Sequence, residues 1–463
     1  MLIFSSDIEY TMLLPPVPQW PEAPTDLTDA VYERRLSAVC SVMQAEGLDA
    51  MLIYADREHG SNFGYFTGFE PRFEEGCLVI HTDGSCWIML GNETLKMHQY
   101  SRIPVTPIHV PYFSLPNQPM AEEMAMEECM KTAGLVQGKR VGLAGWKVFT
   151  GRLSDGSKMF DVPHFIVKGL EDNGCVLANA ANLLMAPDKG LRTICGAEEI
   201  AQHEFAATLA SRCVWSVLEQ VAPGKTEFEL ASNLAVYGQP LSCYSMCATG
   251  DRFTNAVVFP RNKKVVVGDK FTVSMGLRGG LTCRAGYAAE DADQLPEEVC
   301  DYVDALAKPY FAASATWYST VAPGVTGGAV YDAVNAVLPK EQYGWQLNPG
   351  HLTAAEEWLS SPMEKDSKIA LKSGMILQMD IIPKLAPYGG VNAEDGVALA
   401  DEALRAEIAQ RFPETWARMQ LRREYMIDVL GIPIDESVLP MSDTAGYLRP
   451  LLFARDKALR VKK

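Results

Sequence analysis

The order of apolar and polar positions predicts alternating helices and strands from residue 32 onward. Residues 32–47 repeat apolar side chains at helical spacing, and the apolar run 51–55 predicts a short buried strand. Two further strands flank the Asp83-Gly84 pair, which favours a hairpin turn. This pattern predicts one α/β domain over residues 1–185.

Five prolines among residues 15–24 predict an extended arm at residues 1–30 in place of a regular element. Such an arm either packs on a partner subunit or forms a loose terminus, and the sequence leaves both alternatives open.

A second pattern begins at residue 196 and predicts an α+β domain over residues 190–463. It opens with a long amphipathic helix and a Pro223-Gly224 turn. A second helix follows Thr226, with Glu229 three residues on as in a capping box. Strand-like runs then occupy residues 255–260, 270–277, 279–289, 376–383 and 396–401, with a helix over 296–321 between them.

Composition narrows the class of protein. The 463 residues are 48% hydrophobic and 21% charged, as in globular proteins, and the formal net charge is −17. Because the lysines and arginines are dispersed, we expect no nucleic-acid partner. No basic leader or long apolar run is evident, so we expect no membrane partner. Eleven cysteines without paired CxxC spacing indicate reduced thiols and favour a cytoplasmic protein.

Candidate chemistry gathers in the second half of the chain. His351 follows a Pro-Gly pair, Asp380 closes an apolar strand, and Glu394 precedes the next apolar run. Carboxylates and a histidine at strand ends are ligands that divalent metal ions accept, and they also serve as acids and bases. The three cysteines near these strands (Cys243, Cys247 and Cys283) show no spacing that marks a nucleophile, so we interpret them as structural thiols.

The order of several segments resembles the creatinase/aminopeptidase P/prolidase superfamily, the M24 metallopeptidases. Residues 61–71 (SNFGYFTGFEP) resemble a segment of the family's N-terminal domain. Residues 198–231 resemble the helix pair that opens its catalytic domain, and residues 265–276 resemble its first ligand strand. The resemblance implies a creatinase-like α/β domain followed by a pita-bread α+β domain.

The same resemblance implies a degenerate metal site. Active family members hold two divalent ions with two Asp, one His and two Glu. His351 matches the histidine, whereas Asp380 and Glu394 match the two glutamates. The first aspartate falls on Ser274 and the second on Arg284 or Ala285, unless an alternative alignment supplies Glu290. Two further family histidines also lack a match, since one falls at residue 257 or 258 and the other within residues 354–358.

Our leading interpretation is a creatinase-like hydrolase without a metal cofactor, acting on a C–N bond of a small, polar, nitrogen-rich metabolite. His351 would be the acid or base, Asp380 and Glu394 would hold substrate or water, and Arg284 would replace the metals. The alternative is an Xaa-Pro peptidase using Mn, Zn or Fe through His351, Asp380, Glu394 and Glu290. A ligand-binding protein without catalysis is the third possibility.

The resemblance further implies a homodimer in which the N-terminal domain of one subunit covers the pocket of its neighbour. Arg57, His59 and Arg72 are therefore candidate substrate contacts from that domain. Within the pocket, Glu356 and Glu357 are candidate contacts for a cationic group of the substrate, and Trp358 is expected to lie beside them.

Overall fold

The computed structural model describes residues 1–463 except residues 22, 152, 236, 255–258 and 463. The described chain divides into two compact units, Leu27–Arg192 and Met1–Asp26 with Thr193–Lys463. The N-terminal arm therefore belongs to the second unit, although the sequence assigned it to the first.

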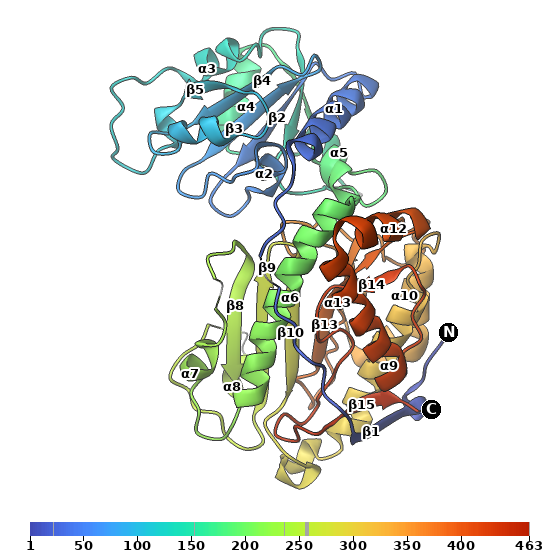
Figure 1. The fold of residues 1–463 in the computed structure, drawn as a ribbon. Coiled ribbons are helices and arrows are strands. Elements are labelled where there is room, and N and C mark those ends of the chain that lie inside the picture. Colours follow the sequence, from blue (N-terminus) through green and yellow to red (C-terminus); the bar gives the residue numbers. More distant parts are fainter. Residues whose placement is uncertain (22, 152, 236, 255–258, 463) are drawn as a thin grey trace. The chain divides into compact units, whose positions relative to one another are not determined.

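The unit Leu27–Arg192 is an α/β domain built on a six-stranded mixed sheet (Figure 1). The strand order is β5-β4-β3-β2-β6-β7, and β2 pairs antiparallel with β3 but parallel with β6. Every residue of β2 is buried, as expected for the central strand of a sheet covered on both faces. Its elements are α1 (Asp29–Ala45), β2 (Ala50–Ala55), α2 (Ser61–Thr67), β3 (Gly76–His81), β4 (Cys86–Leu90), β5 (Thr106–His109), α3 (Met126–Thr132), β6 (Arg140–Ala144), α4 (His164–Asp172), β7 (Val176–Asn179) and α5 (Ala181–Met185).

The second unit contains a larger sheet whose strands are all antiparallel, in the order β11-β12-β13-β10-β9-β8, with β14 also paired to β13 (Figure 1). Its strands are β8 (Leu241–Thr249), β9 (Lys270–Leu277), β10 (Gly280–Tyr287), β11 (His351–Leu352), β12 (Ile376–Met379), β13 (Asn392–Leu399) and β14 (Val438–Pro440). Its helices are α6 (Ala197–Gln220), α7 (Glu227–Ala231), α8 (Asp251–Thr254), α9 (Lys308–Thr320), α10 (Gly327–Val337), α11 (Lys340–Tyr343), α12 (Glu402–Arg411) and α13 (Pro413–Glu424).

Helix α6 packs against β9 and β10 on one face of this sheet (Figure 1). The approach is so close that a side chain at Gly280 would meet the backbone of Ala207 at 2.5 Å. Because side chains alternate across a strand, Gly280, Thr282 and Arg284 share this helix-covered face. Cys283 therefore points to the opposite face.

The capping box predicted at Thr226 and Glu229 is confirmed at the start of α7. The Thr226 side chain accepts a hydrogen bond from the Glu229 amide, and the Glu229 carboxylate accepts one from the Thr226 amide. The strand predicted over residues 255–260 lies largely outside the described residues. Position 257 or 258, where a family histidine lacks a match, lies outside them entirely.

The N-terminal arm is fixed to the second unit of its own chain. Strand β1 (Ile8–Met12) pairs antiparallel with β15 (Lys457–Val461). Further along the arm, Gln19 donates its amide proton to Asp443, and Leu14 accepts a hydrogen bond from the Tyr425 hydroxyl. The loose terminus considered from the sequence is therefore not observed. Within the described residues, no helix is long and apolar enough to cross a membrane.

Candidate functional site

Four side chains form a row across the face of the large sheet opposite α6. Ser274 on β9 lies directly opposite Cys283 on β10, and Cys283 lies directly opposite Glu394 on β13. The register of β12 and β13 continues this row to Asp380, the residue after β12. Directly opposed residues hold their Cβ atoms about 5 Å apart, so these side chains are neighbours on one surface.

His351 begins β11 at the end of this row and is fully buried. Its Nδ1 lies 3.1 Å from the carbonyl oxygen of Leu352, which can accept a hydrogen bond but cannot donate one. Nδ1 therefore carries the proton, and the lone pair of Nε2 faces the site. The indole of Trp358 stacks on the imidazole with a centroid separation of 4.0 Å and fixes the plane of the ring.

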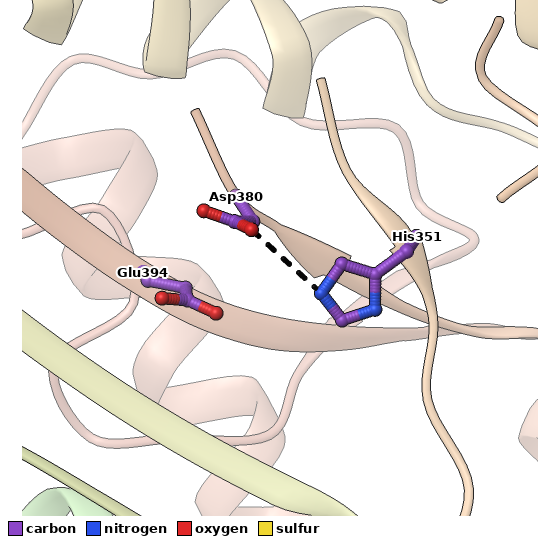
Figure 2. Close-up of side chains that lie close together, drawn as sticks. All are labelled: His351, Asp380 and Glu394. Atoms are coloured by element: carbon purple, nitrogen blue, oxygen red, sulfur yellow. Dashed lines mark ion pairs between the residues drawn. The ribbon is translucent and has the colours of Figure 1, made fainter. Parts of the chain in front are cut away.

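Figure 2 shows His351, Asp380 and Glu394 converging on one small volume, with one ligand atom from each lying within 4.8 Å of the others. His351 Nε2 lies 4.0 Å from Asp380 Oδ2 and 3.4 Å from Glu357 Oε1. The amide of Gln378 donates to Glu394 Oε1 at 3.2 Å and to the Leu281 carbonyl at 2.8 Å, which holds the glutamate in place.

The cluster is electrostatically strained without a cation. Burial raises the pKa of Asp380 to about 6, with Glu357 adding to the rise and His351 opposing it. Burial, then the charges of Asp380 and Glu357, raise the pKa of Glu394 well above its usual range. The charged forms of both acids are therefore disfavoured by their surroundings, and a nearby positive ion would stabilise them.

A single divalent ion fits this environment. Asp380 Oδ1 and His351 Nε2 are buried polar atoms that have no hydrogen-bond partner within the described part of the chain. A neutral imidazole nitrogen with two carboxylates is a donor set used for zinc and for iron. His351, Asp380 and Glu394 would hold the ion, and the ion would supply the positive charge that the buried carboxylates lack.

Arg284 does not face this cluster, contrary to the sequence interpretation. Its side chain lies on the helix-covered face, where it forms a buried ion pair with Asp395 and donates to the Thr444 carbonyl at 2.5 Å. It also donates to the backbone carbonyls of Cys283 and Glu394. Side-chain alternation along β10 is the reason, because Arg284 follows the residue that points into the site.

The residue that faces Ser274 across the β9–β10 hairpin is Cys283. It lies directly opposite both Ser274 and Glu394, whereas Arg284 and Ala285 pair with Val273 and Thr272. A two-residue turn at Arg278-Gly279 sets this register. Glu290 is exposed beyond the end of β10 and is not part of the three-residue group.

The other predicted site residues fall into two groups. Glu357 reaches His351, while the Glu356 carbonyl accepts a hydrogen bond from the Ala354 amide. The candidates Arg57, His59 and Arg72 belong to the α/β domain. There His59 stacks on Trp146, Arg72 pairs with Glu70, and Arg57 is exposed.

Sequence reasoning missed two residues of the site. Gln378 supports Glu394, and its position two residues before Asp380 on the same strand face was the available signal. Cys283 was noted as a thiol near the pocket strands, but the sequence alone did not show that it pairs with Ser274 and Glu394.

Comparison with known proteins agrees with this architecture. Residues 35–148 match the Creatinase/Prolidase N-terminal domain family. A curated relative, the uncharacterized peptidase YqhT of Bacillus subtilis (strain 168), is 25% identical over 226 residues, covering 46% of this chain and 62% of the relative. The chain thus matches less than two thirds of that relative's length.

Solved structures share the fold over most of the chain. The dipeptidase PepE from Mycobacterium ulcerans superposes with a TM-score of 0.61 at 18% identity, covering 81% of this chain and 94% of its own. A recombinant prolidase from Thermococcus sibiricus gives a TM-score of 0.63 at 20% identity, covering 80% and 95%. At these identities the likeness shows the fold.

The chain thus combines a Creatinase/Prolidase N-terminal domain at residues 35–148 with the fold of the dipeptidase and prolidase structures, and a His-Asp-Glu cluster lies on one face of its larger sheet. These findings agree with the resemblance to the creatinase/aminopeptidase P/prolidase superfamily that the sequence shows.

Proposed function

We propose that this protein is a metal-dependent hydrolase of the peptidase class. One ion would be held by His351, Asp380 and Glu394, and the substrate would be a small peptide of the dipeptide or Xaa-Pro type. The observation that carries the proposal is the buried group of three ligand atoms, one imidazole nitrogen and two carboxylate oxygens, within 4.8 Å of one another. The peptidase, dipeptidase and prolidase names of the similar proteins support the substrate class.

We infer one ion in place of the family's two. Ser274 matches the first family aspartate in the sequence resemblance, Cys283 faces it across the hairpin, and neither supplies a carboxylate. The charged donors are therefore confined to the side of the row nearest His351. A second ion at the Ser274 end would lack the anionic ligands that a hard divalent cation requires.

A bound ion supplies a Lewis acid that polarises a carbonyl and lowers the pKa of a water molecule. The protein's own residues would orient the His351 ring and move protons into and out of the site. The Leu352 carbonyl fixes the tautomer of His351, and Trp358 fixes its ring plane. Glu357 is the partly exposed carboxylate next to the cluster, so it is suited to exchange a proton between the site and solvent.

The metal-free interpretation loses its main support. It required Arg284 beside Asp380 and Glu394, but the guanidinium is committed to Asp395 on the other face. Without that cation, buried carboxylates with raised pKa values favour a metal ion as the neutralising group.

We further propose a cytoplasmic homodimer in which Arg57, His59 and Arg72 of one subunit contact the substrate bound by the other. The support is the family resemblance, and the three residues lie on or beside a loop of the α/β domain. Light scattering of the purified protein measures the oligomer. Kinetics of Arg57→Ala, His59→Ala and Arg72→Ala then test the contacts, since KM should rise while the bound metal stays constant.

The first experiment is metal analysis by plasma mass spectrometry combined with a peptidase assay on Ala-Pro, Gly-Pro and non-proline dipeptides. We expect about one ion per chain, hydrolysis that a chelator abolishes, and loss of both in His351→Ala. The exposed His164→Ala is the matched control and should keep both. Stoichiometric metal without hydrolysis of any peptide would indicate a binding protein, and the absence of metal would refute the proposal.

A further inference from the structure

We propose that Gln378 is a positioning residue of the metal site. Its side-chain amide would hold Glu394 so that one carboxylate oxygen is left for the ion that His351 and Asp380 also bind. This inference rests on the proposed function and deepens it, because it names a residue outside the ligand group that controls how tightly the ion binds.

The place of Gln378 on β12 puts it at the centre of the ligand group. Its backbone lies directly opposite His351 on β11 and directly opposite Gly396 on β13. Asp380 follows two residues later, so the side chains of Gln378 and Asp380 leave the same face of the sheet. Gln378 is therefore linked to His351 by strand pairing and to Asp380 by the alternation of side chains.

The side-chain amide of Gln378 connects this centre to the third ligand. Its Nε2 donates to the Leu281 carbonyl oxygen at 2.8 Å and to Glu394 Oε1 at 3.2 Å. Gln378 is 1% exposed, so both hydrogen bonds form away from solvent. Among the residues that the structure describes, no other hydrogen bond reaches the Glu394 carboxylate. The amide therefore occupies Oε1 and leaves Oε2 for an ion.

The other end of the same amide indicates why a glutamine stands at this position. Gln378 Oε1 is buried and has no hydrogen-bond partner within the described part of the chain. An unpaired buried carbonyl oxygen costs free energy, and an apolar side chain of similar size would avoid that cost. The donor end of the amide, which contacts Glu394, is therefore the end that the site uses.

The neutral charge of this donor suits a site for a cation. Asp380 and Glu394 balance one divalent ion when both are ionised. A lysine or arginine in place of Gln378 would repel that ion, whereas the amide orients Glu394 without adding charge. Hydrogen bonds to metal ligands fix their orientation, and removing such a bond typically lowers metal affinity by about 10- to 100-fold.

Gly396 supplies the space that the amide occupies. A Cβ added at this glycine would lie 3.1 Å from Gln378 Oε1, which is closer than an ordinary van der Waals contact. The amide would have to move by a few tenths of an ångström to relieve this contact. Gly396→Ala therefore displaces the amide while the three ligands and Gln378 itself stay unchanged.

The test is zinc binding to the metal-free full-length protein, measured by competition with a chromophoric chelator. We expect the dissociation constant to rise by about 10- to 100-fold in Gln378→Met, which keeps the length of the side chain but has no donor. Gly396→Ala should raise it by a smaller factor. Leu377→Met is the matched control, because its side chain leaves the opposite face of β12, and it should bind zinc as the wild type does.

A second readout distinguishes a positioning role from a purely structural one. A structural role would lower the melting temperature of the chelator-treated variants but leave the zinc affinity of the folded protein unchanged, and this result would refute the inference. Circular dichroism verifies that each variant is folded. If Gln378→Met does not fold, Gly396→Ala carries the test, and wild-type zinc affinity in that variant would refute the positioning role.

The outcomes also separate this inference from the proposed function. Equal zinc affinity in the wild type and in Gln378→Met would overturn the positioning role and leave the His-Asp-Glu site intact. A loss in Leu377→Met as large as that in Gln378→Met would indicate a general disturbance of β12 and would refute the role as well. Failure of the wild type to bind zinc would overturn both proposals.

Discussion

Arg284 and Asp395 form a buried ion pair on the helix-covered face of the large sheet, directly behind the row of Ser274, Cys283, Glu394 and Asp380. Arg284 bridges the backbone of Glu394 and the Thr444 carbonyl as well, so it connects β10, β13 and the segment after β14. The arginine therefore supports the site from behind and takes no part in its chemistry.

Removing this arginine should destabilise the protein strongly. Arg284→Met leaves Asp395 as a buried carboxylate without its cation, which typically costs about 3–5 kcal/mol of unfolding free energy. Urea denaturation measures the loss. The exposed Arg34→Met is the control and should change stability by less than about 0.5 kcal/mol. A loss as small as the control's would contradict the assigned role.

Neutralising a ligand should stabilise the metal-free protein. Asp380→Asn removes one of the carboxyl groups that burial and mutual repulsion disfavour, and we expect a gain of roughly 1 kcal/mol in chelator-treated protein. We expect zinc to raise the melting temperature of the wild type by binding to the folded state, and the same change should abolish that rise. Calorimetry with and without zinc measures both effects. A lower melting point of the variant in chelator would count against the electrostatic account.

Acid stability should depend on Glu204, which is buried on α6. Burial alone would raise its pKa, but Arg422 and Arg418 outweigh burial and hold the pKa below its usual range. A lowered pKa gives a stabilisation that is complete above the unfolded value of about 4.3 and is lost as the pH falls through the folded value. Asp443 also forms an ion pair with Arg422, at 2.8 Å, and is the second carboxylate of this cluster.

The measurement is the unfolding free energy from pH 7 downward in the wild type and in Glu204→Gln. The variant should be less stable near neutrality and should show a shallower loss below about pH 4.5, because one titrating group is gone. The exposed Glu33→Gln should retain the wild-type profile. Parallel curves for the wild type and Glu204→Gln would contradict the expectation.

The turn of the β9–β10 hairpin should tolerate no side chain at Gly279. This residue has φ +76°, and an added Cβ would lie 1.5 Å from Nδ1 of His203. Gly138 has nearly the same backbone angle, φ +82°, with nothing within 4 Å of the added atom. Gly138→Ala should therefore cost about 1 kcal/mol from the backbone alone, and Gly279→Ala clearly more. Equal losses in thermal denaturation would show that the contact with His203 is unimportant.

Local patterns predicted much of the fold because they depend on neighbouring residues. The capping box at Thr226 and Glu229, the long helix α6 and the strands β9, β10 and β12 all follow from spacing within a few turns or pleats. The arm was assigned to the wrong unit because its pairing with β15 joins residues at opposite ends of the chain. No local pattern records such a contact.

The site shows how a small error in register changes the chemistry. His351, Asp380 and Glu394 were identified individually, and the structure brings them together. The second family aspartate was matched to Arg284 or Ala285, with a gap of one residue in the hairpin left open. A two-residue turn at Arg278-Gly279 pairs Ser274 with Cys283, and a slip of one residue exchanges the faces of the sheet.

The pairing of β1 with β15 also constrains the order in which the molecule assembles during synthesis. Strand β1 leaves the ribosome before the α/β domain, but its partner, Lys457–Val461, is made after that domain and after the other strands of the second unit. The α/β domain lies wholly between them, so it is complete before the ribbon can form. The arm must therefore stay unpaired with β15 until residues 457–461 have emerged. Closure of the β1–β15 ribbon is accordingly a late step in maturation.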